Sequence, residues 1–205
     1  RKKLKLHTNI RPCVSFPGNI NNLNDNIDLV IFRENSEGMY SGVEFYPIPK
    51  EIYSTLKKYN INMNHFDEFD LKELAISTRI MSKNRCKSIV EQAFKYAKNN
   101  NKKNVTLVDK PNVLRETGQL MIDSAVEVSK SYKNIELTQF NIDAMCMQLI
   151  KNPDKFSVIV AENMFGDILS DLSAQLVGGL GFAPSANIGD EYAIFEPCHG
   201  SAPKY

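Results

Sequence analysis

The sequence lacks an excess of either charge and lacks any long hydrophobic run. Lysine and arginine total 25 against 24 aspartates and glutamates, a formal net charge of +1, which gives no electrostatic reason to bind nucleic acid or an acidic membrane surface. The longest apolar runs, such as DLVIF and FSVIVA, are far shorter than the roughly 20 residues that span a bilayer. The basic start RKKLKLH is followed by no apolar signal-peptide core. We therefore expect neither a nucleic-acid partner nor a membrane.

Closely spaced cysteines are missing too. Cys13, Cys86, Cys146 and Cys198 are spread along the chain without a CxxC pair, which favours reduced thiols in a cytoplasmic protein over zinc ligands or disulfides. The composition, 42% hydrophobic and 24% charged over 205 residues, is typical of a globular protein of one large or two small domains. The chain begins with Arg1 rather than methionine and ends in a loop-like segment, so we expect a piece of a longer protein.

Short buried-strand patterns alternate with helical patterns along most of the chain. The patterns predict strands at 26–32, 104–109, 135–140 and 156–162, and helices at 82–100, 115–132, 143–152 and 167–181. This alternation predicts an α/β layered fold. Ser82 is a candidate helix N-cap, and Gly118 is a weak point of the second helix. Residues 41–76 break the alternation with prolines, aromatics and acids, and we expect an irregular insertion there.

Polar residues follow directly after the predicted strands. RENSEGMY follows DLVIF, DKPN follows VTLV, NIDAM follows IELTQF, and ENMFGD follows VIVA. Ligands of α/β proteins bind preferentially at the carboxyl ends of strands, although loops after strands are polar in any case. The residues that could converge on one site are Arg33, Tyr40, Lys110, Asp143, Asp167 and Asp171.

Three of these candidates are aspartates. Asp167 and Asp171 would lie one turn apart on the same helix face, where like charges repel. Each has a structural alternative near a helix N-terminus, and Asp143 could be an N-cap. Together the three acids fit a hard divalent cation with oxygen ligands. Without His or Cys beside them, the donors favour Mg²⁺ or Mn²⁺ over Zn²⁺.

Cationic and proton-carrying residues accompany the acids. Arg1, Arg11 and Arg33 could be solvated surface charges. Guanidinium groups also bind carboxylates through two parallel hydrogen bonds, which would suit a substrate with more than one carboxylate. Tyr40 and Lys110 are candidate proton carriers, because a metal and cationic neighbours can lower their pKa values towards the working range.

Taken together, these stretches resemble the isocitrate and isopropylmalate dehydrogenases, the β-decarboxylating dehydrogenase family. The segments RENSEGMYSGVE, NMFGDILSD, GGLGFAPSANIGD and AIFEPCHGSAP are specific in combination, and the resemblance runs nearly end to end. It implies an isopropylmalate dehydrogenase-like fold with three parts. These would be a small α/β domain (7–37 and 77–177), parts of a larger dinucleotide-binding domain (1–6 and 178–205), and a clasp that joins two subunits (38–76).

The resemblance also implies roles for single residues. Substrate carboxylates would be bound by Arg1, Arg11 and Arg33. The catalytic pair would be Tyr40 and Lys110, with the lysine reaching the neighbouring subunit's site. The metal ligands would be Asp167 and Asp171 of one chain and Asp143 of the other. The dinucleotide would be bound by Asn112, Glu196, His199, Gly200, Ser201, Ala202, Lys204 and Tyr205.

The implied reaction is metal-dependent oxidative decarboxylation of isocitrate to 2-oxoglutarate, in a homodimer or larger homo-oligomer with shared sites. Lys204 and Tyr205 favour NADP over NAD, since a cation and a hydroxyl suit a 2′-phosphate. The alternatives are 3-isopropylmalate as the 2-hydroxy acid, or a truncated or regulatory subunit without activity. In one departure, Asp109 stands where the family usually has His, and a second acid there could alter the proton affinity of Lys110.

Overall fold

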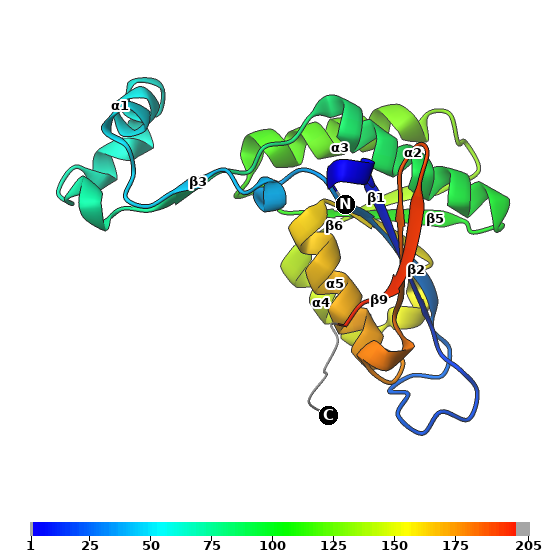
Figure 1. The fold of residues 1–205 in the computed structure, drawn as a ribbon. Helices are drawn as coiled ribbons and strands as arrows, with labels where there is room; N and C mark the ends of the chain where they lie inside the picture. The colour runs from blue at the N-terminus through cyan, green and yellow to red at the C-terminus, as the bar shows by residue number, and fades with distance from the viewer. Residues whose placement is uncertain (1, 200–205) are drawn as a thin grey trace.

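A seven-stranded mixed sheet lies between two layers of helices in the computed structural model, which describes residues 2–199 (Figure 1). In spatial order its strands are β6 (Glu136–Asn141), β5 (Asn104–Asp109), β7 (Val158–Ala161), β2 (Asp28–Glu34), β1 (Thr8–Val14), β8 (Pro184–Ile188) and β9 (Ala193–Pro197). The first four run parallel, and β1, β8 and β9 add antiparallel pairings. The predicted α/β class is confirmed.

Four long helices cover the sheet. Two pack on one face, α2 (Lys83–Asn99) and α3 (Arg115–Ser129), and two on the other, α4 (Ile142–Lys151) and α5 (Asn163–Leu176). Ser82 caps α2 as predicted, since its side chain accepts from the Arg85 amide. The predicted start of α5 is four residues late, because Glu162 caps the helix by accepting from the Phe165 amide. Short 3-10 turns complete the body: η1 (Lys2–Leu4), η5 (Pro153–Lys155) and η6 (Leu180–Phe182).

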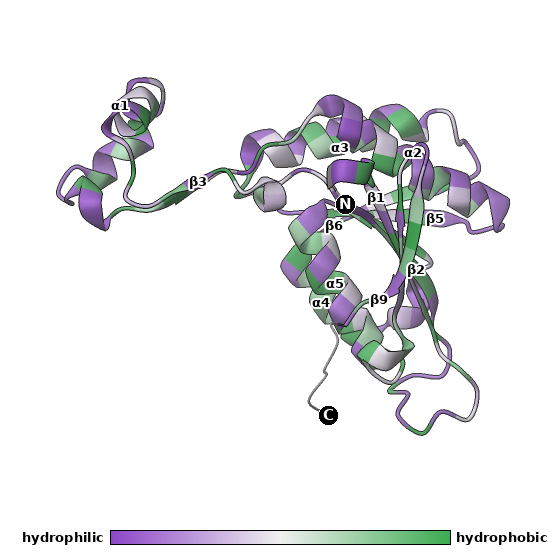
Figure 2. Ribbon diagram, in the orientation of Figure 1, coloured by the Kyte–Doolittle hydropathy of each residue, from purple (hydrophilic) through white to green (hydrophobic). Residues whose placement is uncertain are grey.

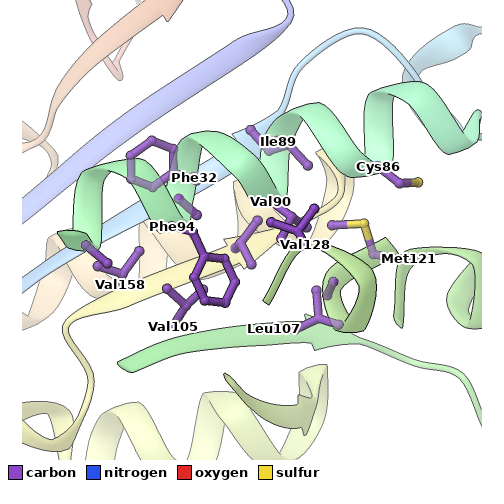
Figure 3. Close-up of a cluster of buried hydrophobic side chains, with 14 of the residues drawn as sticks. Phe32, Cys86, Ile89, Val90, Phe94, Val105, Leu107, Met121, Val128 and Val158 are labelled. Carbon is purple, nitrogen blue, oxygen red and sulfur yellow. The ribbon is translucent and has the colours of Figure 1, made fainter. Parts of the chain in front are cut away.

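Apolar side chains fill both layers between sheet and helices. Between the sheet and these two helices, Phe94 of α2, Met121 of α3 and Val105 of β5 are fully buried (Figure 3). On the other face, Met145 and Leu169 are buried in the same way. Each such side chain contributes about 1.5–3 kcal/mol by its burial. Burial on both faces explains why β2 and β7 read as continuous apolar runs rather than alternating ones.

Residues 38–80, here called the arm, project away from the sheet (Figure 1). They contain η2 (Met39–Ser41), β3 (Glu44–Phe45), α1 (Lys50–Tyr59), η3 (Ile61–Phe66), η4 (Leu71–Glu73) and β4 (Ile76–Ser77). The expectation of an irregular insertion is therefore wrong for α1. Pro49 is the N-cap of this helix rather than an interior residue, so it does not interrupt the helical hydrogen bonds.

The sheet is continuous across the predicted domain boundary. β8, which we assign to the larger domain, pairs with β1 of the smaller one. The division into domains remains a prediction. Within residues 2–199, no helix has the length and apolar character to cross a bilayer.

Candidate functional site

Arg33 lies at the carboxyl end of β2, and its side chain is only 2% exposed. Its Nε donates to Asn163 Oδ1 at 2.9 Å, and its Nη1 pairs with Asp167. Gly166 permits this position, because a Cβ there would lie 2.7 Å from both Cβ and Cγ of Arg33. The glycine in NMFGD thus lets the arginine pass over the first turn of α5.

Arg11, in the middle of β1, engages the second aspartate. Its Nη1 donates to Ser170 Oγ at 2.7 Å and to Asp171 Oδ1 at 3.2 Å, and its Nη2 lies 3.5 Å from Asp167 Oδ1. Asp167 and Asp171 lie one turn apart on α5, as predicted. Within the chain, two arginines therefore balance the repulsion between the two aspartates.

Tyr40, in η2 at the start of the arm, completes this cluster. Its hydroxyl donates to Asp167 Oδ2 at 2.9 Å, and its ring centroid lies 5.3 Å from Arg33 Cζ. Burial raises the pKa of Tyr40, its hydrogen bond to Asp167 raises it further, and Arg33 opposes this only in part. Without a metal, burial and Asp167 together outweigh Arg33, and the lowering expected beside a bound metal remains a prediction.

Lys110 and Asp143 form a separate pair. Lys110 follows β5, and its Nζ lies 2.5 Å from Asp143 Oδ2 in the first turn of α4. The lysine, together with backbone N–H groups, lowers the pKa of Asp143. Residues 2–199 contain no group of three or more His, Cys, Asp or Glu that could hold a metal ion. A single chain thus separates the predicted ligands, a pair on α5 and one on α4, and their sharing between subunits remains a prediction.

Asp109 does not face the amine of Lys110. Its carboxylate accepts from Arg79 at 2.8 and 3.2 Å, and these two side chains are 1% and 4% exposed. It also accepts from the backbone N–H of Lys110 at 2.7 Å. The carboxylate is thus paired with Arg79, and the expected effect of Asp109 on Lys110 remains a prediction.

Three of the predicted cofactor-binding residues lie within the described chain. Asn112 is exposed in the turn after Lys110, Glu196 on β9 accepts from Asn187 Nδ2 at 2.7 Å, and His199 is exposed. The other predicted site residues lie outside residues 2–199: Arg1, Gly200, Ser201, Ala202, Lys204 and Tyr205.

The structure adds residues that sequence reasoning missed. Asn163 and Ser170 hold the two arginines and lie four residues before and three after Asp167, so the helical period could have found them. Arg79 at the base of the arm and Glu162 at the N-terminus of α5 lie next to each other, and both side chains are nearly fully buried. Nothing in the local sequence marks Arg79, because its partners are distant along the chain.

The chain matches known proteins along its whole length. The model of the isocitrate/isopropylmalate dehydrogenase family matches residues 1–205. The chain is 44% identical to Protein DlpA of Legionella pneumophila over 100% of the chain and 32% of that protein. It is 42% identical to homoisocitrate dehydrogenase of Methanocaldococcus jannaschii, over 99% of the chain and 54% of that protein.

A solved structure supports the same relationship. The crystal structure of isocitrate dehydrogenase from Methylococcus capsulatus matches with a TM-score of 0.82 and 39% identity, covering 97% of this chain and 52% of that one. The chain therefore spans about a third to a half of the length of these relatives, and the predicted isopropylmalate dehydrogenase-like fold is confirmed.

Proposed function

The chain belongs to the isocitrate/isopropylmalate dehydrogenase family, and on that premise we propose that the full-length protein is a metal-dependent, NAD(P)-dependent β-decarboxylating dehydrogenase. The observation that carries the proposal is the cluster of Arg11, Arg33, Tyr40, Asp167 and Asp171 beside the carboxyl end of β2. Its charges suit a polycarboxylate and a divalent cation that bind together.

The paired charges of the cluster define what it can bind. Arg11 and Arg33 are 7% and 2% exposed, whereas Asp167 and Asp171 are 31% and 58% exposed. A dication facing the aspartates would leave the two guanidinium groups to the substrate's carboxylates, so every buried charge keeps a partner. The all-oxygen donors fit Mg²⁺ or Mn²⁺.

In this proposal, Asp167 and Asp171 would hold the metal together with Asp143 of the partner subunit. The bound metal would supply Lewis-acid polarisation of substrate oxygens. Arg11 and Arg33 would orient the carboxylates, since their guanidinium groups are already fixed by Ser170 and Asn163.

Tyr40 suits the role of proton donor. Its raised pKa keeps the hydroxyl protonated at neutral pH. The hydroxyl donates its hydrogen bond to Asp167. We assign to it the protonation of the decarboxylated product. Lys110 would accept the hydroxyl proton in the neighbouring subunit's site, where Asp143, its partner in the single chain, would leave the amine to hold the metal.

The substrate and cofactor are finer proposals. We propose isocitrate with NADP, in a homodimer or larger oligomer, and keep 3-isopropylmalate and NAD as the alternatives. The support is RENSEGMYSGVEF for isocitrate and the Lys204–Tyr205 pair for NADP. A comparison of kcat/KM for both acids with both dinucleotides, on the full-length protein, decides between them.

The test of the reaction is metal dependence. Asp167→Asn should abolish most metal-dependent turnover, whereas Asp154→Asn, an exposed carboxylate away from the cluster, should not. Undiminished turnover in excess EDTA would overturn the proposal. Verified mixed dimers of Tyr40→Phe and Lys110→Met subunits should regain activity through one intact hybrid site, and no recovery would argue against shared sites.

A further inference from the structure

Arg79, at the base of the arm, lies between two buried carboxylates. Its Nη1 and Nη2 donate to Asp109 at 3.2 and 2.8 Å, and Nη1 also donates to Thr117 Oγ1 at 2.9 Å. On its other side, Nε lies 3.8 Å from Glu162 Oε2. The ring of Phe165 lies 5.4 Å from the guanidinium carbon.

Each carboxylate leads to a different part of the candidate site. Asp109 accepts from the Lys110 backbone N–H at 2.7 Å and so fixes the start of the loop that carries the lysine. Gly118 of α3 packs against that loop, since a Cβ there would lie 2.9 Å from Pro111 Cα. The Arg79–Asp109 pair therefore fixes the backbone of Lys110.

Glu162 leads to the aspartate helix. Its Oε1 accepts from the Phe165 N–H at 2.9 Å and caps α5, which carries Asp167 and Asp171. A Cβ on Gly38 would lie 2.6 Å from Glu162 Oε2, so the chain leading to Tyr40 also runs close to this carboxylate. The Lys110 loop, the start of α5 and the start of the arm thus meet around the Arg79 guanidinium and the Glu162 carboxylate.

The contacts of Arg79 are unequal. Its Nε and Glu162 Oε2 have no hydrogen-bond partner within the part of the chain that the structure describes, and a buried polar atom left in that state is costly. At 3.8 Å the two atoms are beyond the distance of about 3.2 Å at which an N–H···O hydrogen bond forms. Because the guanidinium is rigid, a movement of Arg79 itself towards Glu162 would lengthen its two bonds to Asp109.

We propose that Arg79 is a positioning residue that couples the Lys110 loop to helix α5. For its catalytic meaning this inference rests on the proposed function, in which the two segments serve different active sites of one dimer. Arg79 would then link the two sites through the interior of each subunit, and a change at the metal aspartates of one site would alter the lysine offered to the other.

The coupling is tested in the full-length protein by hydrogen exchange without any ligand. The reporters are the amides of Leu114 and Gly166, which bond to Lys110 O and Glu162 O at 2.8 Å. Arg79→Met should speed exchange at both amides about tenfold or more, the effect of losing buried charged hydrogen bonds. Arg85→Met is the matched control, since Arg85 makes no side-chain ion pair within residues 2–199. Loosening of one amide only, or of both no more than in the control, would overturn the proposal.

A mutant cycle separates coupling from general destabilisation. Asp109→Asn should change exchange at Gly166, and Glu162→Gln should change exchange at Leu114. Both cross-effects should vanish when Arg79 is lysine, which keeps the charge but not the two-sided geometry. Cross-effects that persist in Arg79→Lys, or that are absent in the parent protein, contradict the inference.

Turnover then connects the coupling to catalysis. In the full-length enzyme Arg79→Lys should lower kcat about tenfold while KM changes by less than about twofold, since alignment rather than binding is lost. An unchanged kcat would deny Arg79 a positioning role. A parent protein with no dehydrogenase activity would overturn the proposed function instead, and the exchange measurements would still decide the coupling.

Discussion

The sheet with its helices buries many of its large apolar side chains, whereas the arm leaves nearly all of its own at least partly exposed. In the body, Phe94 and Met121 are 0% exposed. In the arm, Tyr59 and Ile61 are 77% and 78% exposed, and α1 has no buried residue. Figure 2 shows that hydrophobic and hydrophilic residues both occur along the arm. The body therefore holds itself together by its own packing. The arm exposes apolar surface that a partner could cover, and its role as a clasp between subunits remains a prediction.

The largest effect is expected where the body is best packed. Phe94 lies on the buried face of α2, with its ring centroid 5.1 Å from that of Tyr132, so Phe94→Ala should lower the free energy of unfolding by about 3–5 kcal/mol. Denaturant unfolding of the full-length protein measures this. Phe94→Leu keeps most of the volume and should cost less than half as much. Equal losses for the two variants would mean that this core tolerates the cavity.

A smaller loss is expected at Gly166, where the body meets the site. Gly166→Ala forces its Cβ against Arg33, and such overpacking costs about 1–3 kcal/mol. Turnover should fall as well, because Arg33 must move. The control is Gly181→Ala, where an added Cβ meets nothing within 4 Å. A stable, fully active Gly166→Ala protein would show that Arg33 has room the structure does not indicate.

The pH dependence of stability should differ in sign between the two regions. Burial raises the pKa of Glu162 above its ordinary value of 4.5, so the folded state holds this proton more tightly than the unfolded state. Its contribution to stability is full at low pH and is lost as pH rises through the raised pKa. In the arm, hydrogen bonds from Lys57 and Tyr53 lower the pKa of Asp67 below 3.8, so that contribution is lost as pH falls instead.

Glu162→Gln removes the first of these terms. The free energy of unfolding, measured from pH 4.5 upwards, should then fall less steeply towards high pH than in the parent protein. Asp67→Asn, the comparison in the arm, should leave that range unchanged and alter only the acid limb below it. If the two variants give the same profile, burial does not govern Glu162.

The smallest effect on stability is expected in the arm. Ile61→Ser should change the free energy of unfolding by less than about 0.5 kcal/mol, since the side chain is already exposed. The same change should weaken self-association in sedimentation equilibrium, whereas Ile20→Ser, at a 96% exposed position outside the arm, should not. Equal self-association of the two variants would show that Ile61 does not contribute to the predicted subunit interface.

Sequence patterns predicted those features that depend on a single strand or helix. The parallel strands and α2 to α5 were predicted because their apolar periods are strong, and Asp167 and Asp171 because their spacing is local. β1 was not predicted, since Pro12 and the buried polar Asn9 and Arg11 break any strand pattern. Its conformation comes from pairing with β2 and β8.

The pairing of charges was also beyond the sequence. Which arginine meets which aspartate depends on how β1 and β2 lie against α5, and the partners are 134 and 160 residues apart. Asp109 was read beside its neighbour Lys110, but its carboxylate turns to Arg79, 30 residues away. Local sequence patterns identify which residues carry charge, but they do not identify salt-bridge partners that are distant along the chain.

The base of the arm has a consequence for how this protein can change over evolution. The Gly38 N–H donates to the Ile80 carbonyl at 2.8 Å, and the two residues form an isolated bridge. The arm thus leaves and rejoins the body at a single point. Inserting or deleting residues of the arm between Tyr40 and Arg79 adds only a logarithmic entropy term, and the strands on either side keep their register. This outer part of the arm is a place where the lineage can lengthen, trim or exchange contacts while Tyr40, Arg79 and the sheet behind them keep their positions.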